Sequence, residues 1–184
     1  YDGKKGIKVI PCYYKKDYPE WSDRGDGPGA PVAIHLPNSP VISTGKRDGS
    51  KIRLPNGNYL EETASYFVMV ETKTGGYTPA LITMKSTQLN VSKKWNSMMK
   101  TIQIPDGKGG FAIPPMHGVV YNLASTLQKN DKGSWYGWVV TQDRIMGQDD
   151  KALYLSAKDF AGNVSKGSVQ TKADVEEKTD STPY

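Results

Sequence analysis

Hydrophobic residues along the chain fall into short runs separated by glycine and proline, a pattern typical of strands joined by turns. Runs rich in β-branched and aromatic residues predict strands at 6–14, 62–73, 78–84, 119–127 and 134–140, with shorter candidates at 32–36 and 40–43. Residues 15–31 form a Gly/Pro-rich segment that predicts a long loop. Tight turns are expected at Asp-Gly 48–49, Asn-Gly 56–57, Gly-Gly 75–76 and NDKG 130–133, and these turns favour antiparallel hairpins.

Two segments instead have the three- and four-residue spacing of amphipathic helices. In the first, Ser86 or Thr87 can act as the N-cap. Trp95 lies on the apolar face of this segment, so we expect it in the core rather than against a ligand. The second starts at Asp149 or Asp150, and its expected buried face consists of Leu153, Ala157, Phe160 and Val164.

The order of these elements is strands, helix, strands, helix. It predicts a mostly β fold with two helices, either an antiparallel sheet or an OB-like barrel decorated by helices. The chain of 184 residues is expected to form one domain over 1–170, followed by a flexible, mildly acidic tail at 171–184.

Charge adds a preference for polyanionic partners. The formal net charge is +5; the tail has four acidic residues and two lysines, so its balance is −2 and the remainder carries +7. Positive charge attracts and holds phosphates, although solubility alone would also explain this balance.

Cysteine and histidine usage argues against a metal centre. Cys12 is the only cysteine, and His35 and His117 lie far apart in sequence. A single cysteine forms no internal disulfide and does not hold a structural zinc, so we expect no metal, no cofactor and a reducing, cytosolic setting. No run approaches the length of a membrane span.

Signatures of common enzyme classes are missing from the sequence. It contains no GxxxxGK[ST], GxSxG or HExxH motif. Acidic pairs such as Asp23 with Asp26, or Asp149 with Asp150, are more typical of turns and caps than of metal sites. We therefore predict a binding protein rather than an enzyme.

The positive signal is the interleaving of basic and aromatic residues, the combination that binds single-stranded nucleic acid through phosphate contacts and base stacking. It occurs at residues 13–24, at residues 46–59, and across 72–104, a stretch without acidic residues. The candidate nucleic-acid-binding residues are Tyr14, Lys15, Lys16, Tyr18, Trp21, Arg24, Lys46, Arg47, Lys51, Arg53, Tyr59, Lys85, Lys93, Lys100 and Tyr136.

Alternation along strands limits which aromatic residues can face solvent. Adjacent residues of a strand point to opposite faces, so only one of Tyr13 and Tyr14 is expected outside. The same holds for Trp135 and Tyr136, and Trp138 shares the face of Tyr136. The basic segment 45–53 is equally well explained as an ordinary exposed hairpin.

Three segments resemble parts of small proteins of tailed bacteriophages: IPCYYKKDYPEW, ALITMKSTQLNVSKKWNSMM and NDKGSWYGWVV. The resemblance is to phage single-stranded DNA-binding proteins of the OB-fold class and spans about residues 6–165. It implies a phage-encoded protein in the host cytoplasm. The tail is less acidic than the partner-docking peptide of bacterial-type single-strand binders.

The first hypothesis is a sequence-independent single-stranded DNA-binding protein of phage replication or recombination. Its partners would be DNA, further copies of itself, and replication proteins contacting the tail. The alternative is a virion component of the capsid surface, neck or tail. A metal-dependent nuclease is a third option, which would require carboxylates to converge in space.

Overall fold

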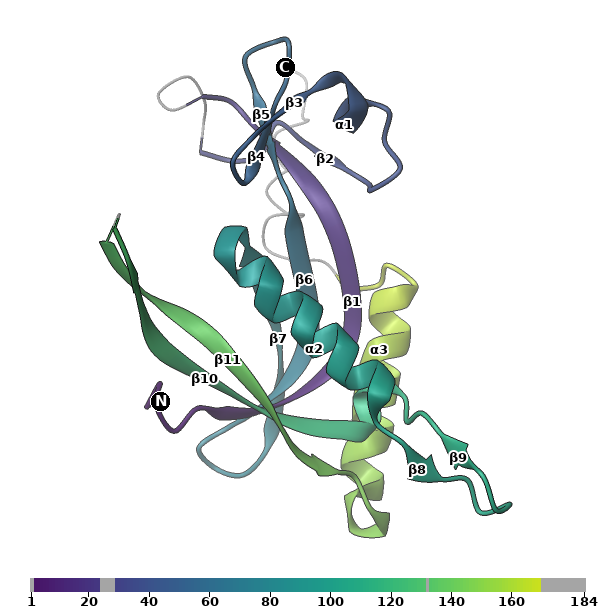
Figure 1. Ribbon diagram of the computed structural model, residues 1–184. Helices are drawn as coiled ribbons and strands as arrows, with labels where there is room; N and C mark the ends of the chain where they lie inside the picture. Colours follow the sequence, from purple (N-terminus) through teal and green to yellow (C-terminus); the bar gives the residue numbers. More distant parts are fainter. Residues whose placement is uncertain (1, 24–28, 132, 170–184) are drawn as a thin grey trace, which may run out of the picture.

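The computed structural model describes residues 2–23, 29–131 and 133–169, and it divides into two regions (Figure 1). The larger region, here called the body, is a curled antiparallel sheet with a helix on each face. The smaller one, the small lobe, comprises the described part of residues 18–61. The strand β1 (Ile7–Trp21) runs from one region into the other and is shared by both sheets.

The body sheet has the strand order β11-β10-β1-β6-β7, with every neighbouring pair antiparallel. Its other strands are β6 (Thr63–Glu71), β7 (Tyr77–Lys85), β10 (Val119–Asn130) and β11 (Gly133–Ile145). The helix α2 (Leu89–Thr101) connects β7 to β10. A curled sheet of these strands with a helix between the third and fourth confirms the predicted OB-like architecture.

The two edge strands of the body, β7 and β11, are bridged by the start of α2. The Gln88 Oε1 atom accepts the backbone N–H of Trp138 on β11 at 2.9 Å. The neighbouring Gly137 permits this approach, because a Cβ atom there would lie 2.5 Å from Gln128 Nε2 and 2.7 Å from Gln88 Nε2. The Gln88 side chain therefore links β7 to β11 at the place where direct pairing of two edge strands would close a full barrel.

Both faces of the body sheet are covered. On the concave face, Trp95 of α2 is fully buried and stacks on Tyr66 with ring centroids 4.3 Å apart. The Tyr66 hydroxyl donates to the Ser92 carbonyl at 3.0 Å, which attaches α2 to the sheet. On the convex face, Ala157 of α3 (Lys151–Ser165) packs on a second cluster around Ile10.

The small lobe has the strand order β2-β1-β5-β4-β3. Its elements are β2 (Ala33–His35), α1 (Val41–Thr44), β3 (Lys46–Asp48), β4 (Lys51–Arg53) and β5 (Tyr59–Glu61). One face of this sheet buries Ile52 and Leu60, which pack with Val41 and Ile42 from α1. Gly49 at φ +58° and Gly57 at φ +90° form the two turns, as the Asp-Gly and Asn-Gly pairs predict.

Short elements complete the described chain. They are a two-stranded ribbon of β8 (Ile104–Pro105) and β9 (Phe111–Ala112), and three 3-10 turns at η1 (Ser86–Gln88), η2 (Met116–Gly118) and η3 (Gln148–Asp150).

Three local predictions were wrong. The expected loop at 15–31 begins only after Trp21, because β6, β2 and β5 supply distant pairing partners for β1. The strand candidate at 40–43 is the helix α1. Ser86 and Thr87 lie in a 3-10 turn, and the N-cap of α2 is Gln88. The predicted tail lies outside the described residues.

Candidate nucleic-acid interface

The face of the small-lobe sheet opposite α1 is exposed at its two edges, while Trp21 and Tyr59 at its centre are half-buried. Cross-strand partners project from the same face of a sheet, and the register pairs Trp21 with Tyr59, Tyr59 with Arg53, and Arg53 with Lys46. These four side chains form one row across β1, β5, β4 and β3. Within the described residues, no helix packs on this side of the sheet, which we call the open face.

Aliphatic side chains border the open face on the other edge. Ile34 of β2 pairs with Pro19 of β1 and therefore lies on the same side as Trp21. Alternation along the chain adds Val32 and Leu36, and the three side chains are 55%, 47% and 65% exposed for Val32, Ile34 and Leu36. The open face thus changes from aliphatic at β2, through aromatic at its centre, to charged side chains at β4 and β3.

The cations of the open face lie close to its aromatic rings. The Lys51 Nζ atom is 3.5 Å from the centroid of Tyr59, and the Arg53 guanidinium carbon is 5.4 Å from it. Arg53 is also paired with Asp23 at 3.2 Å and Asp48 at 3.5 Å. Among the described residues, no carboxylate lies within ion-pairing distance of Lys46 or Lys51, so these lysines are the cations most available to phosphate.

Lys85, at the end of β7, connects the open face to the body. Its Nζ atom lies 6.0 Å from the Trp21 ring centroid and 2.9 Å from Glu61 Oε2. The next residues along the chain line a shallow hollow of about 320 Å³ that also includes Trp135 of the β10–β11 hairpin. Lys85 is thus followed by a small polar hollow that ends at Trp135 of the hairpin.

A second basic surface lies on α2. Its exposed stripe carries Lys93, Lys94 and Lys100, while Trp95 and Met99 face the core. In the described part of the chain, none of the three lysines is ion-paired, so the stripe is a surface of unneutralised positive charge.

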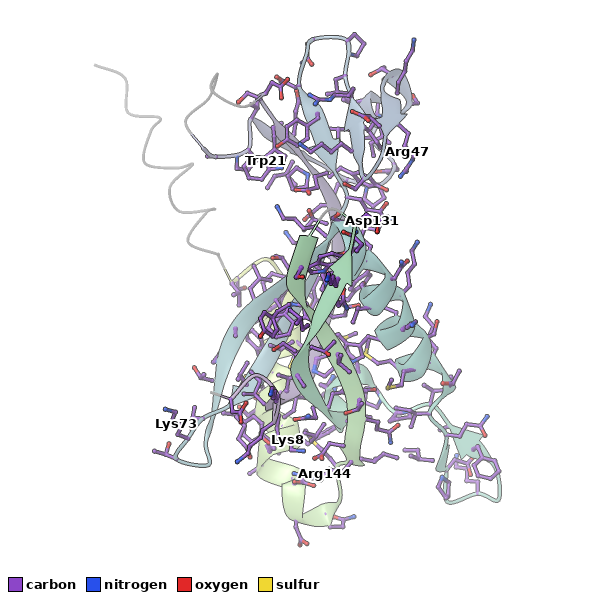
Figure 2. All side chains as sticks on the ribbon, turned by 60° about the vertical axis from the view of Figure 1, so that its left-hand side comes forward. Lys8, Trp21, Arg47, Lys73, Asp131 and Arg144 are labelled. Atoms are coloured by element: carbon purple, nitrogen blue, oxygen red, sulfur yellow. The ribbon has the colours of Figure 1, made fainter. Side chains whose placement is uncertain are left out.

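The remaining predicted residues lie elsewhere. Arg47 pairs with buried Ile52 and so projects from the α1 side of the small lobe. Tyr18 is buried at 8% exposure in the lobe core, and Tyr14 packs on Tyr66 with ring centroids 5.0 Å apart. Trp21 and Arg47 both appear in the small lobe in Figure 2. Arg24 lies outside the described residues.

The adjacent lysines Lys15 and Lys16 of β1 are both paired with acids. Lys15 contacts Asp17 at 3.2 Å, and Lys16 contacts Glu62 at 2.8 Å. The hydrogen bond to Glu62 raises the pKa of Lys16, so this lysine keeps its charge. Each lysine would have to leave its carboxylate in order to bind a phosphate.

Tyr136 lies on the β10–β11 hairpin and is 70% exposed. It borders an apolar hollow of about 460 Å³, together with Ile7, Leu123 and Trp138. Trp135 and Tyr136 point to opposite faces of the hairpin, as alternation predicts.

A polar cleft at the other end of the body was not indicated by the local sequence pattern. It has a volume of about 620 Å³ and is lined in part by Lys5, Lys8 and Lys73. Figure 2 shows Lys8, Lys73 and Arg144 at that end, far from Trp21. Because Lys8 is paired with Asp143, the cleft carries mixed charge.

A part-buried polar network lies on the side of the sheet opposite Trp21. Glu20 Oε1 accepts hydrogen bonds from Asn58 at 2.6 Å and Asn56 at 3.2 Å, and Glu20 Oε2 lies 2.7 Å from His35 Nε2. The bonds from Asn58 and His35 hold the pKa of Glu20 below its usual value. The network connects β1, β2 and the β4–β5 turn beside Trp21.

Other groups of chemical interest are few in the described residues. Burial raises the pKa of the Cys12 thiol to about 12, so this thiol stays protonated at neutral pH. Nowhere in residues 2–23, 29–131 and 133–169 do three His, Cys, Asp or Glu side chains gather as metal ligands would. The helices of the same ranges are too short or too polar to cross a membrane.

Comparison with known proteins gives one finding. A family model described as Pam3 phage gp34-like protein matches residues 1–170. No curated protein and no solved structure matches the chain.

Proposed function

The chain belongs to the Pam3 phage gp34-like protein family, and from this premise we propose that the phage protein binds single-stranded DNA without sequence preference. Its role would be in phage replication or recombination, in the host cytoplasm, as a binding protein and not as an enzyme. The observation that carries the proposal is the cross-strand row of Trp21, Tyr59, Arg53 and Lys46 on the open face.

The row combines the two interactions that single strands require. Aromatic rings offer a surface on which any base can stack, and alanine substitutions put this stacking at about 1–3 kcal/mol per base. Lys46 and Lys51 lie at one end of the row, where they can contact the phosphates of the same strand. Stacking and phosphate contacts do not read base edges, which supports sequence-independent binding.

The OB-like body supports the same proposal. In OB-folds, the loop between the first two strands and the loop between the last two flank the nucleic-acid site. Here the small lobe occupies the first connection and the β10–β11 turn the second. Lys85 and Trp135 lie between them, so a strand leaving the open face would next meet this hairpin.

The proposal is tested by fluorescence anisotropy of a labelled oligo-dT strand, titrated with the protein at low and at moderate salt. We expect binding that weakens with salt, with a slope of about −0.7 for each phosphate contacted. Duplex DNA of equal length should bind more weakly, because its bases are not free to stack.

A double substitution of Trp21→Ala and Tyr59→Ala should weaken binding, while Lys158→Ala on α3 serves as a control outside the open face. Absence of binding at low salt, or equal affinity of the wild type and the double variant, would contradict the proposal.

The second candidate function is a virion component. It is favoured by the exposed aliphatic residues Val32, Ile34 and Leu36, because apolar patches on a surface mark assembly contacts. Detection of the protein in purified phage particles by mass spectrometry, together with no binding to oligonucleotides, would decide for this alternative.

A further inference from the structure

The ribbon of β8 and β9 projects from the body as a short finger with an apolar surface. Phe111 is 70% exposed and Ile113, just beyond the ribbon, is 59% exposed. The intervening turn is held by Asp106, whose Oδ1 atom accepts the backbone N–H groups of Lys108 at 2.8 Å and Gly110 at 2.9 Å. This turn presents the apolar side chains in a fixed position instead of letting them collapse onto the body.

The hollow beside Tyr136 is also apolar, and it is concave where the finger projects. Its walls are formed by Ile7, Leu123, Tyr136 and Trp138, and its volume is about 460 Å³. The hollow therefore has room for an aromatic ring and lies in the size range of pockets that bind small ligands. Leu127, the cross-strand partner of Tyr136, is 60% exposed beside it and extends the apolar surface.

The finger and the hollow cannot meet within one molecule. Figure 1 shows the β8–β9 ribbon on one side of the body, and the N-terminal segment with the β10–β11 hairpin on the other. The finger of one copy is free to enter the hollow of another.

We propose that a second copy of this chain inserts Phe111 and Ile113 into the hollow beside Tyr136. Both surfaces are apolar and belong to the same chain. The finger carries one acid and one base, Asp106 and Lys108, so it brings no net charge to the rim of the hollow, where Asp2 lies. Contact between different surfaces of identical subunits is heterologous, so each added copy leaves one finger and one hollow free. The subunits therefore associate head to tail into chains or closed rings.

This inference does not rest on the proposed function, and it is tested without DNA. Sedimentation velocity of the wild type over a concentration series should show species that grow with concentration. Phe111→Asp replaces the apolar side chain that enters the hollow, and Tyr136→Asp puts a charge in the apolar wall of the hollow. Each variant alone should therefore remain monomeric. Leu155→Asp is the matched control, because Leu155 is an exposed aliphatic residue of α3 that belongs to neither surface.

Mixing the two monomeric variants gives the sharpest result. The finger of Tyr136→Asp can still enter the hollow of Phe111→Asp, so the mixture should form dimers and nothing larger. If circular dichroism shows that Tyr136→Asp is unfolded, Ser125→Arg replaces it, since Ser125 also lines the hollow.

Three outcomes would overturn the inference. The wild type could stay monomeric at every concentration, which would leave these surfaces to another partner. The mixed variants could fail to form dimers, or Leu155→Asp could abolish association as completely as Phe111→Asp.

Discussion

The body and the small lobe are built on the same long strand, but their sheets are covered differently. The body sheet is covered by α2 on one face and α3 on the other. Among the described residues, the small-lobe sheet has only the four-residue helix α1 on one face. Its other face has exposed aliphatic and basic side chains and half-buried aromatic ones. The body can bury enough apolar surface to provide stability, while the small lobe leaves its open face available for contacts.

Two tryptophans illustrate the difference. Trp95 is fully buried in the body, where it stacks on Tyr66 and makes an edge contact with Tyr121. Trp21 lies in the small lobe on a face that no helix of the described residues covers. The same residue type is expected to act in folding in one region and in binding in the other.

The largest effect is expected from Trp95→Ala. Removing a buried tryptophan leaves a cavity and should lower the free energy of unfolding by about 3–5 kcal/mol. Denaturant unfolding followed by circular dichroism measures this decrease. A decrease below about 1 kcal/mol would show that the α2 layer is not the main source of stability, and the comparison between the regions would fail.

Trp21→Ala and Tyr59→Ala should reduce binding more than stability. Each is expected to weaken binding of oligo-dT by about 1–3 kcal/mol, with a much smaller effect on unfolding than Trp95→Ala. Anisotropy titrations and denaturant unfolding of the same preparations measure both quantities. If the affinity for oligo-dT fell only as far as the loss of folded protein explains, the open face would have a structural role and not a binding role.

Replacing Lys46 and Lys51 together by alanine should reduce the salt dependence of binding. For single strands, the magnitude of the slope falls by about 0.7 for each phosphate that the variant no longer binds. The slope is measured from anisotropy titrations at several salt concentrations. Arg47→Ala is the control, because it removes a charge on the other side of the same sheet. Its salt slope should stay closer to that of the wild type. An equal reduction of the slope in Arg47→Ala would place the phosphate-binding surface elsewhere.

The smallest effect concerns Glu20 and acid pH. Because the native pKa of Glu20 is lowered, its ionised form stabilises the folded state at neutral pH. This contribution is lost as the pH falls through the lowered native pKa. Stability of Glu20→Gln should be lower than that of the wild type at pH 7, and the difference should narrow below about pH 4. Thermal unfolding across about pH 3–7 measures it, and a constant difference would contradict the role assigned to the network.

Local sequence patterns were sufficient for most of the body. The spacing of apolar residues located α2 and α3 and placed Trp95 in the core, and the Gly-containing turns located the hairpins. These features depend on neighbours within a few residues. The family match supports a phage protein, while DNA binding stays a prediction.

The open face could be predicted only in part, because it depends on pairing between distant segments. Trp21 and Tyr59 are adjacent because β1 continues beyond the expected loop and pairs with β5. The sequence grouped Lys46 with Arg47, whereas strand alternation places them on opposite faces of the sheet. That alternation was a usable signal, but the pairing of β1 with β5 was not visible in local sequence.

The most direct test of the open face is tryptophan fluorescence during titration with oligo-dT at two salt concentrations, in the wild type and in Trp21→Phe. We predict quenching of the wild type at low salt, reversal by added salt, and disappearance of most of the quenching in Trp21→Phe. No change in wild-type fluorescence at low salt, or equal quenching in Trp21→Phe, would contradict the assignment of the open face as a site for single-stranded DNA.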